Sequence, residues 1–137
     1  MPSEPPSVVR PRRRQARPAE SPDPAGVLTQ AVLRASGLLG LSQAELARTL
    51  GVSEAGVSRL ASGSRSIDPL SKEGELALLL VRLYRSLDAL VGNDATRRSA
   101  WFSSFNHALN GRPAELVLRA EGLAAVVAYL DGMRAPL

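Results

Sequence analysis

The sequence predicts an all-α protein, and three observations support this fold class. Apolar residues recur at three- and four-residue steps from Val27 onward, and almost no stretch alternates with the two-residue period of a strand. Serines precede several of the apolar segments and glycines follow them, as helix caps do. The chain of 137 residues could hold one ordinary domain or two small ones. We expect an arm of residues 1–26 and two helical units, residues 27–68 and 69–137.

Residues 1–26 are rich in proline and arginine. They hold seven of the ten prolines, which remove amide donors, and few apolar residues that could offset the entropy of ordering. We therefore predict a disordered arm. Its five arginines could lie along DNA phosphates, and a solubilising tail without specific contacts is an equal alternative. These arginines are Arg10, Arg12, Arg13, Arg14 and Arg17.

The composition excludes several classes of function. The chain has no cysteine and a single histidine, so it cannot form disulfides or use a thiolate nucleophile, and we expect no metal site and no cofactor. The longest strongly apolar run, Leu76 to Val81, is far shorter than the roughly 20 residues that cross a bilayer. No signal-peptide core follows the start. We expect a soluble cytoplasmic protein that does not contact membranes.

The first two helices are bounded by clear signals. The first begins at Val27 and ends where Gly37 and Gly40 interrupt the apolar pattern. The second follows Ser42, because Glu45 stands three residues later and the two side chains together suit a capping box. Such a box satisfies two backbone amides that a helix start leaves unpaired.

The second and third helices have the pattern of a DNA-binding helix-turn-helix. Gly51 ends the second helix and can adopt the left-handed turn, and Ser53 caps a short third helix that Gly63 ends. Ala47 is small, as it must be where the two helices cross closely. The remaining apolar positions would fix the angle between the helices, and these are Leu46, Leu50, Val52, Val57 and Leu60.

The phrase "SQAELARTLGVS…VSRLASG" resembles the Xre-type repressor helix-turn-helix over about residues 27–68. In that family the second helix of the motif enters the major groove, so the resemblance implies an operator DNA partner. By position it assigns base contacts to Glu54, Ala55 and Arg59. It assigns phosphate contacts to Gln43 and Ser53, and two further contacts to Ser58 and Arg65. The alternative is a structural or protein-binding role for the same scaffold. The segment nets only +1, so we expect tight binding to need a second copy or the arm.

The second unit begins with a long apolar helix. It runs from Ser71 to about Val91 and is apolar on nearly every face, so it must be buried on more than one side. Either the later helices cover it completely or part of it meets another protein chain. We predict these later helices from about Asp94 to Ser104, after Pro113, and from about Glu121 to Arg134.

The stretch "WFSSFNHALNGRP" holds the one tryptophan, both phenylalanines and the one histidine. Trp101, Phe105 and Leu109 follow a spacing of four residues, which predicts one buried helical stripe. Phe102 lies about 100° away from that stripe and is expected to face outward. Asn106 is expected to bond the backbone where the helix ends.

The same stretch offers little for catalysis. Gly111 is expected to make the turn and Pro113 to begin the next helix. His107 has Ser103 and Ser104 at helical spacing, but a serine–histidine pair without an orienting group or an oxyanion donor is weak evidence for a nucleophile. We therefore predict that the protein is not an enzyme.

The C-terminal half is similar to the toxin-binding domain of the Xre/MbcA/ParS antitoxin family over about residues 70–134. The spacing that carries the resemblance comprises Trp101, Asn106, Leu109, Gly111, Pro113, Leu116, Gly122, Val126 and Leu130. The resemblance implies a type II antitoxin that binds and occludes a cognate toxin, usually a RES-domain protein that degrades NAD⁺. It also implies a homodimer within a toxin–antitoxin complex and repression of its own operon.

In that family the C-terminal segment reaches the active-site region of the toxin, which would give this role to about Tyr129–Leu137. The candidate toxin contacts are Phe102, His107, Arg112, Tyr129, Met133, Arg134 and Leu137. The alternative is a stand-alone helix-turn-helix transcriptional regulator whose C-terminal half dimerises or senses a ligand.

Overall fold

Polar caps and left-handed glycines set the bounds of most helices. The computed structural model describes Ser3 and residues 23–134, and in this part of the chain it contains helices and no strand. Side chains that accept from the first amides cap five helices, and these caps are Asp23, Ser42, Ser53, Ser71 and Asp94. The helices are α1 (Pro24–Leu39), α2 (Gln43–Leu50), α3 (Glu54–Ser62), α4 (Lys72–Val91), α5 (Ala95–Ser103), α6 (Pro113–Leu116) and α7 (Ala120–Arg134). The all-α prediction is confirmed.

Helix α1 begins earlier than the sequence suggested. The carboxylate of Asp23 accepts from the amides of Ala25 and Gly26, both at 3.3 Å, and Pro24 occupies the first helical position, which suits its fixed φ. The three residues before Val27 are therefore helical and do not belong to the arm. The five arginines of the arm, for which DNA contact and a solubilising role were equal alternatives, lie outside the described residues.

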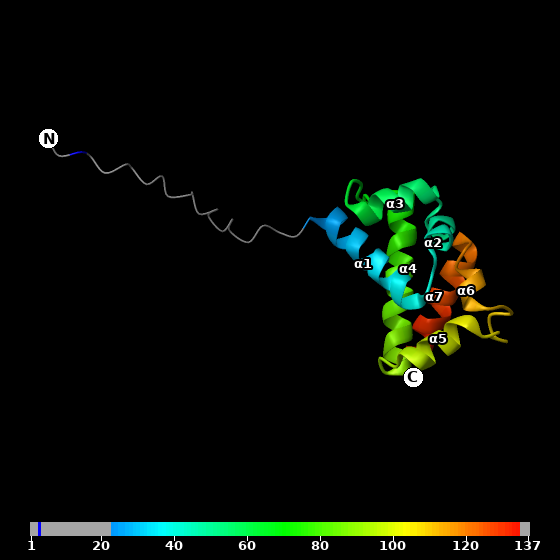
Figure 1. Cartoon of the computed structure of the whole chain (residues 1–137). Helices are drawn as coiled ribbons and strands as arrows, with labels where there is room; N and C mark the ends of the chain where they lie inside the picture. Colours follow the sequence, from blue (N-terminus) through cyan, green and yellow to red (C-terminus); the bar gives the residue numbers. More distant parts are fainter. Residues whose placement is uncertain (1–2, 4–22, 135–137) are drawn as a thin grey trace.

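Helix α4 forms the centre of the fold. Figure 1 shows it as the long green helix, with α1 on one side, α7 on another and α5 at its far end. Leu80, Leu83 and Leu87 are completely buried along it, in one apolar cluster that also includes residues of α1, α2, α3 and α7. The prediction that this helix is buried on more than one side is confirmed.

A buried arginine joins three helices at the far end of the molecule. Arg98 on α5 is 8% exposed, and its Nη1 donates to Oδ1 of Asp88 on α4 at 3.0 Å. Its Nε donates to the carbonyl of Leu38 near the end of α1 at 3.3 Å, and its guanidinium carbon lies 5.5 Å from the ring centroid of Tyr84. The side chain thereby satisfies a terminal helix carbonyl and ties α5 to both neighbours.

No helix of the described residues is long and apolar enough to span a membrane.

Candidate functional site

The helix-turn-helix scaffold packs as its spacing predicted. Ala47 is 4% exposed where α2 meets α3, and Val57 and Leu60 are 1% and 2% exposed on the inner face of α3. Gly51 has φ of 70°, the left-handed conformation expected at the turn. The two helices therefore meet at a fixed angle, and their exposed residues form a defined surface.

Helix α3 presents a small polar surface to solvent. Its cap Ser53 accepts from the amide of Gly56 at 3.0 Å and is itself exposed. Four residues of α3 that were predicted to contact DNA are exposed, and so is Gln43 at the start of α2. The four residues on α3 are Glu54, Ala55, Ser58 and Arg59. Arg59 makes no ion pair with any described residue, so its guanidinium is available to a phosphate or a base edge.

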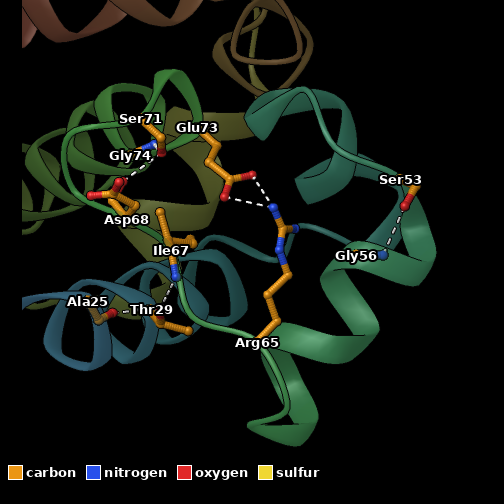
Figure 2. A network of polar contacts seen from close by, with 10 residues as sticks. All are labelled: Ala25, Thr29, Ser53, Gly56, Arg65, Ile67, Asp68, Ser71, Glu73 and Gly74. Atoms are coloured by element: carbon orange, nitrogen blue, oxygen red, sulfur yellow. Dashed lines mark hydrogen bonds and ion pairs between the residues drawn. The ribbon is translucent and has the colours of Figure 1, made fainter.

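Arg65 differs from the other predicted DNA contacts, because its side chain forms an ion pair inside the protein. Figure 2 shows its side chain extending from the segment after α3 to Glu73 on α4. Nη2 donates to both carboxylate oxygens of Glu73, each at 2.8 Å, and the Glu73 side chain is 16% exposed. The guanidinium also lies beside Gly56, where an added Cβ would be 3.2 Å from Nη1. A glycine in the first turn of α3 thus leaves room for this arginine.

The segment between α3 and α4 is held at both ends. The hydroxyl of Thr29 on α1 donates to the carbonyl of Ala25 at 2.7 Å and accepts from the buried amide of Ile67 at 2.8 Å (Figure 2). Further along, the hydroxyl of Ser71 donates to the carbonyl of Asp68 at 2.6 Å. These bonds and the Arg65 ion pair fix α3 relative to α1 and α4. Sequence spacing did not reveal them, because the partners lie up to 38 residues apart.

The aromatic stretch does not form the single helical stripe that was expected. Helix α5 ends at Ser103, so Phe105 lies outside it and its ring is 49% exposed. Phe102, which was expected to face outward, is 3% exposed and belongs to the core. The prediction from the four-residue spacing is wrong, because Ser104 takes an extended conformation and the residues after it are no longer helical. The exposed aromatic residue is Phe105, which the sequence had assigned to the interior.

Residues 104–112 form a projecting loop between α5 and α6 (Figure 1). Asn106 and Gly111 bond across it, with the Asn106 amide donating to the Gly111 carbonyl at 2.9 Å. Oδ1 of Asn106 accepts from the amide of Leu109 at 3.2 Å. Gly111 was expected to make the turn, and the residue of this loop with left-handed backbone is Asn110, with φ of 51°. Gly111 instead leaves room for Leu116, whose side chain would lie 3.1 Å from an added Cβ.

Two predicted toxin contacts lie on this loop. His107 is exposed, and its ring meets that of Phe105 edge to face with centroids 5.1 Å apart. Arg112 is exposed and donates through Nη1 to the carbonyl of Ser103 at 2.8 Å, which closes the base of the loop. The loop therefore exposes an aromatic pair and also a cation, and aromatic residues and arginine are enriched at protein interfaces.

The end of α7 carries the other predicted contacts. Tyr129 is half-buried and stacks on Trp101 of α5, with ring centroids 6.4 Å apart. Met133 is 49% exposed. Arg134 is exposed and donates through Nη1 to the hydroxyl of Ser86 on α4 at 3.1 Å. Leu137, the remaining predicted contact, lies outside the described residues.

A cationic cleft of about 440 Å³ lies between α4 and α7 beside Arg134. Asp131 accepts from Arg82 at 2.5 Å and from the hydroxyl of Ser86 at 3.3 Å, so each of its carboxylate oxygens has a partner. Arg85 lines the same cleft. No cluster of three acidic or histidine side chains that could hold a metal ion occurs among the residues that the structure describes.

Comparison with protein families gives two matches in succession. Residues 18–82 match the antitoxin Xre-like helix-turn-helix domain. Residues 86–135 match the antitoxin Xre/MbcA/ParS C-terminal toxin-binding domain. The short gap between the two matches falls inside α4, the helix that both halves share. No curated protein matches the chain.

Proposed function

The chain belongs to the Xre/MbcA/ParS antitoxin family, and on this premise we propose that it neutralises a cognate toxin by occlusion and represses its own operon. The observation that carries the proposal is the order of the two matched domains, a helix-turn-helix followed by a toxin-binding domain, on one continuous core. The proposed mechanism is tight binding with no chemistry of the antitoxin's own. Since operator DNA lies in the cytoplasm, the proposal assigns the protein to that compartment.

The proposed DNA-binding surface is the exposed side of α3 with the starts of α2 and α3. Arg59 is well suited to grip guanine through O6 and N7, Glu54 to accept from a cytosine amino group, and Ala55 to contact a thymine methyl. The exposed Ser53 and Gln43 would bind phosphates. Arg65 would act through its bond to Glu73, by holding α3 in place, in addition to any contact with DNA.

The proposed toxin-binding surface is the loop of residues 104–112 together with the end of α7. The loop supports this role because Phe105 and His107 expose aromatic area on a backbone that Asn106 fixes. At the end of α7, Met133 and Arg134 are exposed within the segment, about Tyr129–Leu137, that would reach the toxin's active site. The buried Phe102 would support this surface from beneath and would not touch the toxin.

We propose a RES-domain enzyme that degrades NAD⁺ as the toxin, and an antitoxin dimer within the complex. The test uses the full chain, co-expressed with the protein encoded next to it. We expect that neighbouring protein alone to arrest growth and lower cellular NAD⁺, and the antitoxin to restore both. A neighbour that is harmless on its own would favour the alternative, a stand-alone regulator whose C-terminal half dimerises or senses a ligand.

Two full-length variants should separate the two surfaces. Arg59→Ala should lose at least tenfold in affinity for the DNA upstream of its own gene, measured by gel shift, and should still neutralise the toxin. Phe105→Arg should keep DNA affinity and fail to neutralise. The proposal is wrong if Arg59→Ala binds this DNA as well as the wild type, or if Phe105→Arg protects cells fully.

The role of the tail has its own test. A chain that stops after Gly132 lacks the exposed end of α7 and the residues beyond it. We expect it to bind the toxin within about tenfold of the full chain and to leave toxin activity largely restored. Loss of binding itself would show that this segment anchors the complex and does not block the active site.

A further inference from the structure

Three arginines surround the cleft of about 440 Å³ between α4 and α7. Arg82 and Arg85 lie three residues apart on one face of α4, and Arg134 reaches the cleft from the end of α7. Asp131 is the one acidic side chain among the described residues that line it, so the lining has a net charge of +2. The residues of α3 proposed to contact DNA do not line this cleft.

A hydrogen-bonded network orders the floor of the cleft. Arg82 donates to Oδ2 of Asp131, and the hydroxyl of Ser86 donates to Oδ1 at 3.3 Å. That hydroxyl accepts from Nη1 of Arg134 at 3.1 Å, and Ser86 is 3% exposed. Among the described residues these bonds use one nitrogen of each guanidinium, which leaves the other N–H groups for a ligand. Arg82 and Arg134 are therefore positioned before a ligand arrives, which lowers the entropy cost of binding.

Two of the arginines carry charge that no acidic side chain offsets. Neither Arg85 nor Arg134 forms an ion pair with a residue that the structure describes. Both are exposed, and both border the same cleft. Their like charges repel each other, and an anion held between them would replace this repulsion with attraction.

Charge and geometry favour a phosphate group over a single carboxylate. A phosphate monoester carries about −1.5 to −2 at pH 7, which matches the net charge of +2, whereas a carboxylate carries a single negative charge. Each guanidinium presents a planar fork of N–H donors that can bind two phosphate oxygens at once.

The size of the cleft suits a ligand larger than a free phosphate ion. Its volume of about 440 Å³ lies within the range of roughly 300–1,000 Å³ that is typical of small-molecule sites. Space therefore remains beside the phosphate for the rest of a small molecule. We propose that the α4–α7 cleft binds the phosphate monoester of a small metabolite, with Arg85 and Arg134 holding the phosphate.

The end of α7 connects this ligand to the toxin. Arg134 is also a proposed toxin contact, so a phosphate bound to it would engage a side chain that the toxin needs. Ligand and toxin would then lower each other's affinity, because the coupling between two binding equilibria is reciprocal. This competition rests on the proposed function, whereas the ligand site itself does not.

The first test titrates the full chain with ribose 5-phosphate, without toxin or DNA, at an ionic strength of about 0.15 M. We expect saturable binding with a dissociation constant of about 0.1–1 mM, and amide NMR shifts on α4 and α7 around Ser86. Arg85→Gln and Arg134→Gln should each weaken binding at least tenfold, since each removes a charged donor. Arg119→Gln makes the same change at a side chain that is 77% exposed and does not line the cleft, and it should bind as the wild type does.

Three control ligands separate recognition of the monoester from attraction to charge. Succinate carries two negative charges without a phosphate, and ribose is the sugar without a charge; both should bind at least tenfold more weakly than ribose 5-phosphate. Inorganic phosphate should also bind more weakly, because it makes no contacts beyond the arginines. The proposal is overturned if succinate or inorganic phosphate binds as tightly as ribose 5-phosphate, if the NMR shifts are confined to α3 or residues 1–26, or if both arginine variants bind normally.

The second test measures the affinity for the toxin with and without saturating ribose 5-phosphate. The ligand should weaken toxin binding to the wild type at least fivefold. Arg85→Gln, at a residue outside the proposed toxin and DNA contacts, should bind toxin and DNA normally and lose this sensitivity. If Arg85→Gln binds either macromolecule more weakly without the ligand, that macromolecule occupies the cleft and the proposal is wrong. A wild type that the ligand leaves unaffected would contradict the competition. Because the first test contains no toxin, its outcome does not depend on whether neutralisation occurs.

Discussion

The helix-turn-helix and the C-terminal half hold their exposed functional residues in different ways. On α3 the exposed residues alternate with the buried Val57 and Leu60 along a capped helix. Burial of the apolar face of this helix therefore leaves its polar face exposed to solvent. In the C-terminal half, Phe105 and His107 lie on a loop whose shape depends on Asn106. The difference shows that periodicity identifies functional residues only where the helix continues through them.

The largest expected effect on stability distinguishes the buried Phe102 from the exposed Phe105. Phe102→Ala should lower the free energy of unfolding by about 3–5 kcal/mol, because it empties a completely packed site. Phe105→Ala should change it by less than about 0.5 kcal/mol, because the ring is half exposed. Urea unfolding followed by circular dichroism measures both. Phe102→Leu, which leaves a smaller cavity, supplies a value if the alanine variant does not fold. Equal effects at the two positions would contradict the assignment.

The next largest effect on stability concerns two glycines, Gly74 and Gly122, at which another segment of backbone lies very close to the helix. A Cβ at Gly122 on α7 would lie 2.0 Å from the carbonyl oxygen of Leu116, and one at Gly74 on α4 would lie 2.2 Å from that of Asp68. Either alanine variant should cost about 1–3 kcal/mol of unfolding free energy, since backbone must move.

Gly132 provides the matched control for this pair. It lies on the same helix as Gly122 and has open space around its Cβ position. Gly132→Ala should therefore stabilise the protein by about 0.5–1 kcal/mol, through helix propensity alone. Thermal unfolding of the three variants compares them directly. A stabilised Gly122→Ala would show that α6 and α7 pack less closely than described.

Much of the fold follows from local sequence signals. The caps Ser42 and Ser53 and the turn at Gly51 predicted the helix-turn-helix because each acts on neighbouring residues. The Arg65–Glu73 pair could not be predicted, because the resemblance gave Arg65 a possible contact with DNA and the choice depends on tertiary distance. The exposure of Phe105 was missed because the four-residue spacing was extended beyond the predicted end of the helix near Ser104, whereas α5 stops at Ser103.

A smaller effect compares one ion pair from each half. Arg65 and Glu73 form two bonds at 2.8 Å with Glu73 largely buried, whereas the side chains of Arg82 and Asp131 are 59% and 38% exposed. Double-mutant cycles with alanine should give a coupling of about 1–2 kcal/mol for the first pair and below about 1 kcal/mol for the second. Glu73→Gln should also weaken DNA binding, which Asp131→Asn should not. Equal couplings would show that the Arg65 pair does not fix α3.

The smallest effect compares the residues that adopt left-handed backbone. The helix-turn-helix uses Gly51 at φ of 70°, and the C-terminal loop uses Asn110 at φ of 51°. Asparagine tolerates this region better than most residues, so Asn110→Gly should change stability by less than about 0.5 kcal/mol. Asn110→Ala should cost about 1 kcal/mol and should also weaken toxin binding, since strain would be relieved by moving the loop that carries Phe105 and His107. Calorimetry gives the first quantity and titration with the toxin the second. If Asn110→Ala changes neither, the loop does not depend on this backbone conformation, and Asn106 alone must hold it.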